Sequence, residues 1–409
     1  MEFIQNISEK DYSEFVKNHS TSHFLKSYEW GKVSKTRGFS TYYVGVKDEG
    51  KLIATALLLQ KHLPLGFSYF YIPRGYTLDY SNKELLKFFT LKISKFTKEK
   101  GSLFFKIDPD IKLHTIDKDA KAIPGEENNY ELVKFFKEIG FKHKKLNLYF
   151  EGMQPRFTFR VNIQDEMDVI RKRYSKSVNR WIKTANKYNI KTFIGTKKDV
   201  KEFVRLMKMT EKRQGFYSHD YEFYPKLYDI FSKNNNVSVM MAQINIKETL
   251  KVLEEEINNC DDEIKKQKLI DRKNLYQSLG KESNEQIVSA YINIHYGNKS
   301  WYLYGANDMN FKDTFANYKL FDFQIEHSQK LGLEIFDEFG TVGDSNTKKS
   351  VAGLHEFKKK FGGEYTEFIG EFDYVTNRFM YFIFTKLMPL YRKPLLALRH
   401  LKVKMQKTK

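Results

Sequence analysis

The chain has 409 residues, of which 41% are hydrophobic and 16% aromatic, which excludes a disordered chain and is enough to fill the cores of two domains. Lysine and arginine number 70 against 51 aspartates and glutamates, a formal net charge of +19. That excess favours polyanionic partners such as nucleic acid, an anionic membrane surface or a phosphorylated small molecule, although a general lysine bias that aids solubility would give the same charge.

Residues 1–150 alternate helical and strand patterns. The predicted elements are helical segments around 12–16 and 23–33, strands at 41–46, 52–60 and 67–72, a helix at 83–99, a strand at 103–107 and a helix at 131–139. The third strand stops at Pro73-Arg74-Gly75 and the fourth at Asp108-Pro109-Asp110. Interleaved strands and helices predict a mixed α/β (α+β) domain over residues 1–150.

A similar series begins again near residue 157. It comprises a strand at 157–162, a helix at 165–188, a strand at 191–195, a helix at 198–213, strands at 238–246, 286–296 and 299–304, and a helix at 315–331. We therefore predict a second domain of similar structure from residues 151–246 and 286–372, although no sequence repeat is visible.

Residues 247–285 interrupt the second series. They are nearly all charged or amide residues, apart from a stripe with the 3, 4, 3, 4 spacing of a coiled-coil seam: Leu250, Leu253, Ile257, Cys260 and Ile264. Both flanking segments have the pattern of strands of one sheet, and a single helix would carry the chain away at about 1.5 Å per residue. We therefore predict an antiparallel helical hairpin that projects and returns; the alternative is a solvated linker helix.

Two segments are strongly basic. The helix predicted near 167–188 surrounds an apolar stripe with lysines and arginines, which suits a phosphate backbone, although a core-packed helix with a solvated basic face has the same pattern. Residues 373–409 form a tail that has no acidic residue from Lys386 onward and interleaves cations with leucines. This composition suits docking on an anionic membrane surface without crossing it; a frayed basic terminus packed by its leucines is the alternative.

Several common devices are absent from the sequence. It contains no GxxxxGK[ST] loop, no HExxH, no paired metal-ligand spacing and no GxSxG. An enzyme with this sequence would therefore position two substrates and stabilise charge, without a metal or cofactor. The lone Cys260, an N-terminus unlike a secretory signal and the lack of an apolar run of about 18 residues lead us to expect a cytoplasmic protein, with at most peripheral contact with the inner face of the membrane.

Eight short segments carry a resemblance to a known family. They are Trp30–Lys32, Tyr71–Gly75, Asp79–Glu84, Lys106–Asp110, Trp301–Ala306, Phe339–Thr341, Phe357–Lys359 and Ile369–Val375. In this order the chain resembles the Fem family of non-ribosomal peptidoglycan aminoacyltransferases, and within it the FemX type that adds the first bridge residue to lipid II. The resemblance implies two domains of the GNAT acyltransferase fold, with the helical hairpin as an arm inserted in the second.

The resemblance also implies an activity. Family members move an amino acid (glycine, alanine or serine are the candidates) from aminoacyl-tRNA to the side-chain amine of the third residue of the stem peptide. The acceptor is lipid II or a UDP-linked muramoyl pentapeptide, and aminoacyl-tRNA is a co-substrate rather than a cofactor. We expect direct attack of the amine on the ester. The rival hypotheses are a GNAT-fold acyl-CoA N-acyltransferase, whose pyrophosphate loop the sequence lacks, and a non-catalytic tRNA- or membrane-binding protein.

The resemblance assigns roles to individual residues. Lys32 matches a lysine that pairs with the precursor's diphosphate, and Arg74 lies in one of the shared segments and is expected to bind substrate. Tyr302 and Tyr304 match tyrosines that line the precursor cleft. Alternatively, Lys32 and Lys358 could be two of many surface lysines, and the tyrosines could simply be core residues.

Four further residues follow from the same comparison. Lys358 matches a lysine that stabilises the oxyanion formed on the ester, and Asp108 an aspartate at the cleft mouth, sometimes considered a base. A second phosphate-binding arginine of the family aligns with His219, which is largely neutral near pH 7, and the tyrosine of that motif is Phe223. Either Arg213 or another base replaces the arginine, or the diphosphate is held more loosely.

Overall fold

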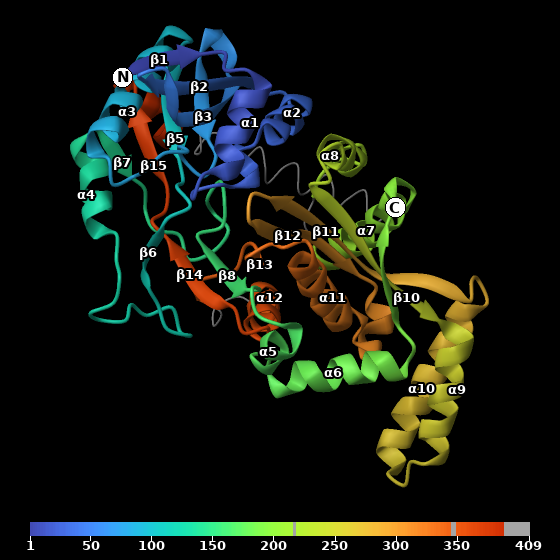
Figure 1. Ribbon diagram of the computed structural model, residues 1–409. Helices are drawn as coiled ribbons and strands as arrows, with labels where there is room; N and C mark the ends of the chain where they lie inside the picture. Colours follow the sequence, from blue (N-terminus) through green and yellow to red (C-terminus); the bar gives the residue numbers. More distant parts are fainter. Residues whose placement is uncertain (216–217, 345–348, 388–409) are drawn as a thin grey trace.

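A computed structural model of the protein describes residues 1–215, 218–344 and 349–387, which form two β-sheets flanked by helices (Figure 1). The predicted mixed α/β architecture is confirmed. Within the described ranges, no helix combines the length and the apolarity that a bilayer crossing requires.

The first sheet has seven strands in the order β1-β2-β3-β4-β5-β15-β7. Its strands are β1 (Glu2–Gln5), β2 (Ser40–Asp48), β3 (Lys51–His62), β4 (Ser68–Ile72), β5 (Ser102–Ile107), β7 (Phe141–His143) and β15 (Phe372–Val375). The helices around it are α1 (Glu9–Asn18), α2 (Tyr28–Thr36), α3 (Lys83–Glu99) and α4 (Tyr130–Glu138), with short 3-10 turns η1 (Phe24–Lys26) and η2 (Pro64–Gly66).

The second sheet has eight strands in the order β6-β14-β8-β13-β12-β11-β10-β9. They are β6 (Lys112–Thr115), β8 (Phe157–Asn162), β9 (Lys191–Gly195), β10 (Val237–Asn245), β11 (Glu285–Tyr296), β12 (Lys299–Asn307), β13 (Ile335–Asp337) and β14 (Glu364–Phe368). Its helices are α5 (Met167–Lys172), α6 (Lys176–Lys187), α7 (Val200–Gln214), α8 (Phe223–Ser232), α11 (Ala316–Lys330) and α12 (Lys349–Lys359), with 3-10 turns η3 (Lys197–Asp199) and η4 (Met309–Thr314).

The two sheets repeat one topology. In each, an edge strand and two helices precede three antiparallel strands, then a helix and a strand that is parallel to the third, β4 with β5 and β12 with β13. In each, a strand from elsewhere in the chain is then inserted before the last strand of the series, β15 in the first sheet and β8 in the second. This common order agrees with the prediction of two similar domains.

The structure differs from the predicted domain boundaries in two strands. β6, within residues 1–150, pairs with β14 and belongs to the second sheet. β15, which begins at Phe372 and extends into the predicted tail, pairs with β5 and β7 of the first sheet. Each sheet is thus completed by a strand from the other half of the chain.

The segment between β10 and β11 is a helical hairpin. Helices α9 (Ile246–Asn258) and α10 (Glu263–Gly280) pack against one another and project from the second domain (Figure 1). Leu253 and Cys260 of the predicted stripe are buried, whereas Ile264 is exposed. The predicted hairpin is therefore present, with bounds a few residues narrower than 247–285.

The helix predicted over 165–188 is interrupted. Helix α5 ends before Arg173, and α6 begins after Ser175, whose backbone is extended and donates to the carbonyl of Lys360. Tyr174 and Val178, two residues of the apolar stripe on this predicted helix, are nevertheless buried. The basic surface is therefore divided between two helices that meet at an angle (Figure 1).

The interface between the domains is itself a hydrophobic core. One cluster joins Phe24 and Trp30 of the first domain to Tyr224, Val239 and Trp301 of the second. Separate clusters lie within each domain. Burial of apolar surface is worth about 25 cal/mol per Å², so this shared core fixes the domains together and makes the two parallel strand pairs parts of one unit.

Candidate functional site

The parallel strand pair of each sheet diverges at its C-terminal end. In the second domain, β12 and β13 pair only from Lys299–Ile335 to Trp301–Asp337, and β12 then continues to Asn307 paired on its other side with β11. In the first domain, β4 and β5 pair as far as Ile72–Ile107. Polar side chains that follow the paired residues therefore face an opening in the sheet instead of a neighbouring strand.

Asp108 and Arg74 meet where β4 and β5 diverge. Asp108 accepts hydrogen bonds from the Tyr71 hydroxyl at 2.8 Å and the Arg74 backbone N–H at 2.7 Å. Burial raises the pKa of Asp108 to about 6, against the opposing charge of Arg74. Arg74 has a left-handed backbone (φ 55°), and its side chain donates to the Pro155 carbonyl at 3.2 Å. Both residues line a small cavity of about 20 Å³, room for about one water molecule.

A buried ionic relay joins this point to the second domain. Arg160 of β8 donates to Asp110 at 2.5 Å and to Asp337, at the end of β13, at 2.8 Å. Asp337 also accepts from the Thr158 hydroxyl at 2.6 Å and the Phe339 backbone N–H at 2.8 Å. The turn after β13 is therefore held by a chain of charged groups that begins beside Asp108.

Lys358 holds the same turn from its other side. Its ammonium donates to the backbone carbonyls of Glu338 at 2.6 Å, of Gly340 at 2.8 Å, and of Phe339. A lysine has three N–H donors, so all of them are engaged. Phe339 and Gly340 both have positive φ, 50° and 25°, and strained backbone persists only where its surroundings enforce it. Lys358 is therefore a clamp on a strained turn, and burial lowers its pKa to about 8.

Sequence analysis did not identify Glu338 as a candidate site residue. It is fully buried, and neither of its oxygens has a hydrogen-bond partner in the described part of the chain. Burial raises its pKa well above the usual range, although the charge of Lys358 opposes this. A buried carboxyl with a raised pKa beside an ammonium depends on the fold of the turn, so no motif in Asp-Glu-Phe-Gly predicts it.

Tyr302 and Tyr304 lie on opposite faces of the sheet. Residues two apart on a strand normally share a face, but a β-bulge inserts Leu303 between the partners of Asn293 and Ile292, and a bulge re-aims the side chains beside it. Tyr302 lies under Lys358, whose Nζ is 5.3 Å from the ring centroid. Its hydroxyl occupies the space that a side chain at Gly305 would fill. The two tyrosines therefore face different surroundings.

Tyr304 joins an aromatic group at the domain interface. Its hydroxyl is 3.0 Å from Nε2 of His219, whose ring lies 3.8 Å from that of Phe223. Burial, with a smaller effect from the charge of Arg37, lowers the pKa of His219 to about 4. The histidine is thus neutral at pH 7. The guanidinium of Arg37, at the end of α2 in the other domain, lies 5.8 Å from the Phe223 ring centroid.

Arg37 therefore supplies the positive charge that His219 does not. Sequence analysis did not identify Arg37, since it belongs to the other domain and reaches the aromatic group only through the domain interface. Arg213, the residue that sequence analysis considered as the replacement for the arginine, lies in the last turn of α7. It donates to the Asn307 carbonyl at the long distance of 3.5 Å. Lys32, also on α2, is partly exposed; its Nζ contacts Glu9 at 2.5 Å and lies 5.0 Å from the Tyr28 ring centroid.

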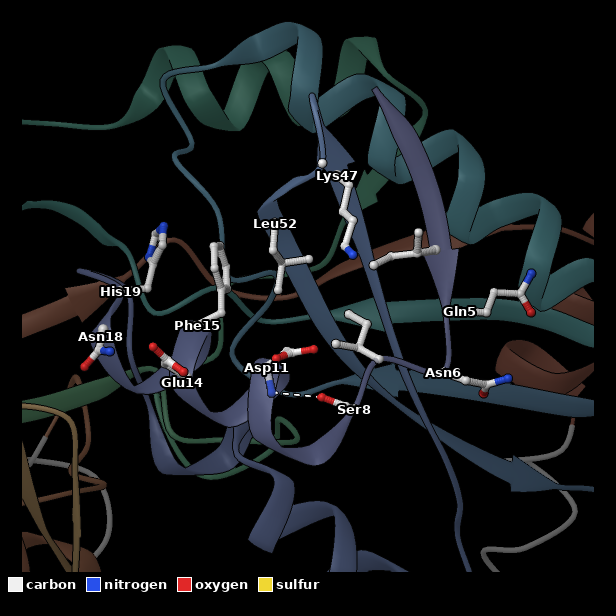
Figure 2. Close-up of a pocket in the computed structure, with 13 residues that line it drawn as sticks. Gln5, Asn6, Ser8, Asp11, Glu14, Phe15, Asn18, His19, Lys47 and Leu52 are labelled. Atoms are coloured by element: carbon white, nitrogen blue, oxygen red, sulfur yellow. Dashed lines mark hydrogen bonds between the residues drawn. The ribbon is translucent and has the colours of Figure 1, made fainter.

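A wide groove of about 870 Å³ lies elsewhere, between α1 and the first strands. Figure 2 shows Asp11 and Glu14 beside Lys47 and His19 along it. None of the eight predicted site residues lines this groove, and its mixture of acidic and basic groups does not suit a diphosphate. Nor do three or more His, Cys, Asp or Glu side chains gather as possible metal ligands in the described ranges.

Comparisons with known proteins cover nearly the whole chain. The sequence model of the FemAB family matches residues 7–278 and 267–388. A lipid II:glycine glycyltransferase of Staphylococcus epidermidis is 28% identical over 411 residues, covering 94% of this chain and 95% of that protein. A protein of the same name from Staphylococcus aureus is 28% identical over 414 residues, with the same coverage.

A solved structure agrees with these sequence comparisons. The crystal structure of FemX superposes with a TM-score of 0.78 at 26% identity, over 93% of this chain and 99% of FemX. The predicted fold class, a mixed α/β chain like that of FemX, is thereby confirmed.

Proposed function

The chain belongs to the FemAB family and stands close to FemX, and from this membership we propose that it is an aminoacyltransferase of peptidoglycan synthesis. It transfers glycine, alanine or serine from aminoacyl-tRNA to the side-chain amine at the third position of the stem peptide, in lipid II or its UDP-linked counterpart. The observation that carries this proposal is the near end-to-end match to relatives named lipid II:glycine glycyltransferase.

Two anionic substrates have to be gathered for this reaction. The net charge of +19 favours both. For tRNA we propose the exposed face of α6, where Lys176, Arg180 and Lys183 project into solvent. Arg173 and Lys187 on the same surface are already paired with Asp165 and Glu256. Contacts of this kind bind phosphate without reading bases, so transfer should slow as salt is raised.

The precursor diphosphate is proposed to lie along α2, between Lys32 and Arg37. Both are cations of one helix at the domain interface, and Arg37 lies against the His219–Phe223 pair. An arginine can hold a diphosphate through two parallel hydrogen bonds. Arg37 thus takes the role of the family's second phosphate-binding arginine, whose aligned position in this chain is occupied by His219.

Replacing Arg37 by methionine should raise KM for the precursor about tenfold or more with little change in kcat, because a charged hydrogen bond contributes about 1.5–3 kcal/mol. Steady-state kinetics with varied precursor measure this. Arg213→Met is the matched control, since Arg213 lies near the same strand but outside the aromatic group. An equal KM effect in both variants would contradict the assignment.

The chemistry is proposed to take place around the turn at 338–340. Lys358 fixes this turn and places positive charge beside the ester, while proximity lowers the barrier. The acceptor amine gives up a proton before it attacks. Asp108 is the proposed acceptor of that proton: each of its oxygens receives one hydrogen bond and keeps a free lone pair.

The dependence of kcat/KM on pH tests these two roles. We expect the rate to rise with pH through about 6, where the Asp108 carboxyl ionises, and to fall through about 8, where Lys358 loses its proton. Asp108→Asn should flatten the acid limb and leave the alkaline limb in place. If the acid limb persists in that variant, another group is responsible.

The proposed function is tested by incubating the protein with lipid II and a mixture of charged tRNAs, then measuring product mass. A mass increase of one amino acid residue is the expected result, and repetition with single charged tRNAs identifies the residue. Modification by acetyl-CoA without tRNA would favour the acyl-CoA transferase instead. If neither donor changes the mass of the precursor, the result would favour the non-catalytic binding protein.

A further inference from the structure

The last described helix presents aromatic residues to solvent. Helix α13 (Arg378–Phe382) continues into the π-helical turn η5 (Ile383–Leu387). Its inner side packs through Tyr381 and Phe384 against Phe104. On its outer side Phe379 is 73% exposed and Phe382 55% exposed. At helical spacing these two share a face with the exposed cations Arg378 and Lys386.

A second exposed apolar side chain lies at the same edge of the first domain. Leu65, in the turn η2 between β3 and β4, is 90% exposed and has a left-handed backbone with φ 61°. Leucine seldom adopts that conformation. Leu63 and Phe67, which lie two residues to either side of Leu65, pack in one hydrophobic cluster with Tyr381. The turn and α13 are therefore adjacent. Nothing in the fold of the domain requires an apolar residue at this tip.

The surroundings of these residues are mainly basic. Gly66 packs against Gly101, which follows the last turn of α3, where the cations Lys98 and Lys100 flank a single acidic residue, Glu99. No acidic residue occurs after Asp373. An exposed face of phenylalanine and leucine, bordered by lysine and arginine, has the composition of surfaces that rest in the headgroup region of an anionic bilayer. A protein partner would more often be met by a mixed polar rim.

We propose that Leu65, Phe379 and Phe382, with Arg378 and Lys386, form a docking surface for the anionic lipid bilayer; these five residues are the docking patch. The inference rests on the proposed function, because lipid II is held in a membrane. The aromatic side chains enter the interface, and the cations meet lipid phosphates. A second copy of the chain and residues 388–409 are the other occupants, which the experiment distinguishes.

The position of the patch relative to the candidate site fits this role. The patch borders the N-terminal ends of β4 and β5, next to Ser68 and Leu103, and Arg74 and Asp108 follow their C-terminal ends. At about 3.3 Å per residue the strands separate the two places by roughly 17 Å, similar to the length of five extended residues. An extended stem peptide anchored at a membrane therefore has the length needed to span this separation.

The experiment measures binding of the full chain to vesicles that contain phosphatidylglycerol and phosphatidylcholine but no precursor. The Phe379→Ser/Phe382→Ser variant and Leu65→Ser are compared with Ile264→Ser, an exposed apolar residue on the helical hairpin (73% exposed). We expect the double variant to lower the vesicle partition coefficient about tenfold or more and Ile264→Ser to leave it unchanged. Transfer to lipid II in vesicles should fall in parallel, whereas transfer to a water-soluble short-chain analogue should not.

Several outcomes would overturn the proposal. These are a wild-type protein that does not bind the vesicles, a double variant that binds as well as wild type, or a truncation after Leu387 that alone removes binding while the double variant keeps it. A change of sedimentation coefficient in the double variant without loss of vesicle binding would assign the patch to a second copy. Because the binding arm contains no precursor, vesicle binding without any transfer would refute the proposed function and leave the docking patch standing.

Discussion

Replacing Lys358 by methionine is expected to lower kcat about 100-fold or more and the free energy of unfolding by about 3 kcal/mol. The kinetic loss is expected because the turn at 338–340 loses both its fixed conformation and the positive charge beside the ester, an effect about the size of removing one charge-stabilising group. The loss of stability arises because methionine fills the space but leaves the carbonyls of 338–340 without their donor, and each buried unsatisfied group costs about 1–3 kcal/mol. Urea unfolding and steady-state kinetics on the same preparation measure both.

The two losses together distinguish a clamp from a free charge. A lysine that only meets the oxyanion would affect turnover and leave unfolding unchanged. Lys359→Met is the matched control, since the Nζ of that neighbour donates a long hydrogen bond to the Lys118 carbonyl at 3.3 Å, and it should behave as wild type. A Lys358→Met protein of normal stability and low kcat would refute the clamp and favour direct contact with the ester.

Replacing Arg160 by methionine should lower the free energy of unfolding by about 3–5 kcal/mol, because two buried carboxylates, Asp110 and Asp337, lose their shared partner. Since the relay also fixes the turn that Lys358 holds, kcat should fall even under conditions where the variant is fully folded. The double variant Arg160→Met/Asp110→Asn removes one of the stranded charges and should recover part of the stability. Arg180→Met, on the exposed face of α6, is the control.

The pH dependence of stability gives an independent reading of the relay. Burial alone would raise the pKa of Asp110, but the charges of Arg160 and Lys299 outweigh it, so the pKa lies below the usual value. A depressed carboxyl pKa stabilises the fold above the unfolded pKa of about 3.9, and this stability is lost as the pH falls below it. In Arg160→Met the Asp110 pKa should rise instead, so stability should decline as pH increases from about 4 to 7. A pH dependence unchanged from wild type would show that the relay contributes nothing.

Much of the fold could be predicted because the relevant signals are local. The helix predicted at 83–99 and the strand at 157–162 have those bounds in the structure, since the helix repeats its apolar residues every three to four positions and the strand alternates apolar with polar residues. The interruption of the helix at Ser175 was missed, because it depends on a hydrogen bond to the distant Lys360 carbonyl. Helix α8 was not predicted, because its sequence was interpreted only as a binding motif.

The candidate site was less predictable, because it is assembled by distant contacts. The segment with Lys358 pointed to a functional lysine, but its three carbonyl partners come from a turn whose positive φ values have no local signature at Phe339. The β-bulge that places Tyr302 and Tyr304 on opposite faces of the sheet likewise has no recognisable sequence pattern. Arg37 meets Phe223 only because the two domains share a core. The roles assigned to all eight predicted site residues stay predictions.

The strand insertions have a consequence for biogenesis. Within the described strands, β7 pairs only with β15, and β5 also meets β15 on one side. While the ribosome is still translating, the nascent first half therefore holds two open sheet edges until Phe372–Val375 has emerged, and open edges invite pairing with other chains. Contacts between residues so far apart in sequence slow folding. Separately expressed halves should accordingly aggregate, and a chaperone that shields the unfinished N-terminal half would be of greatest use late in synthesis.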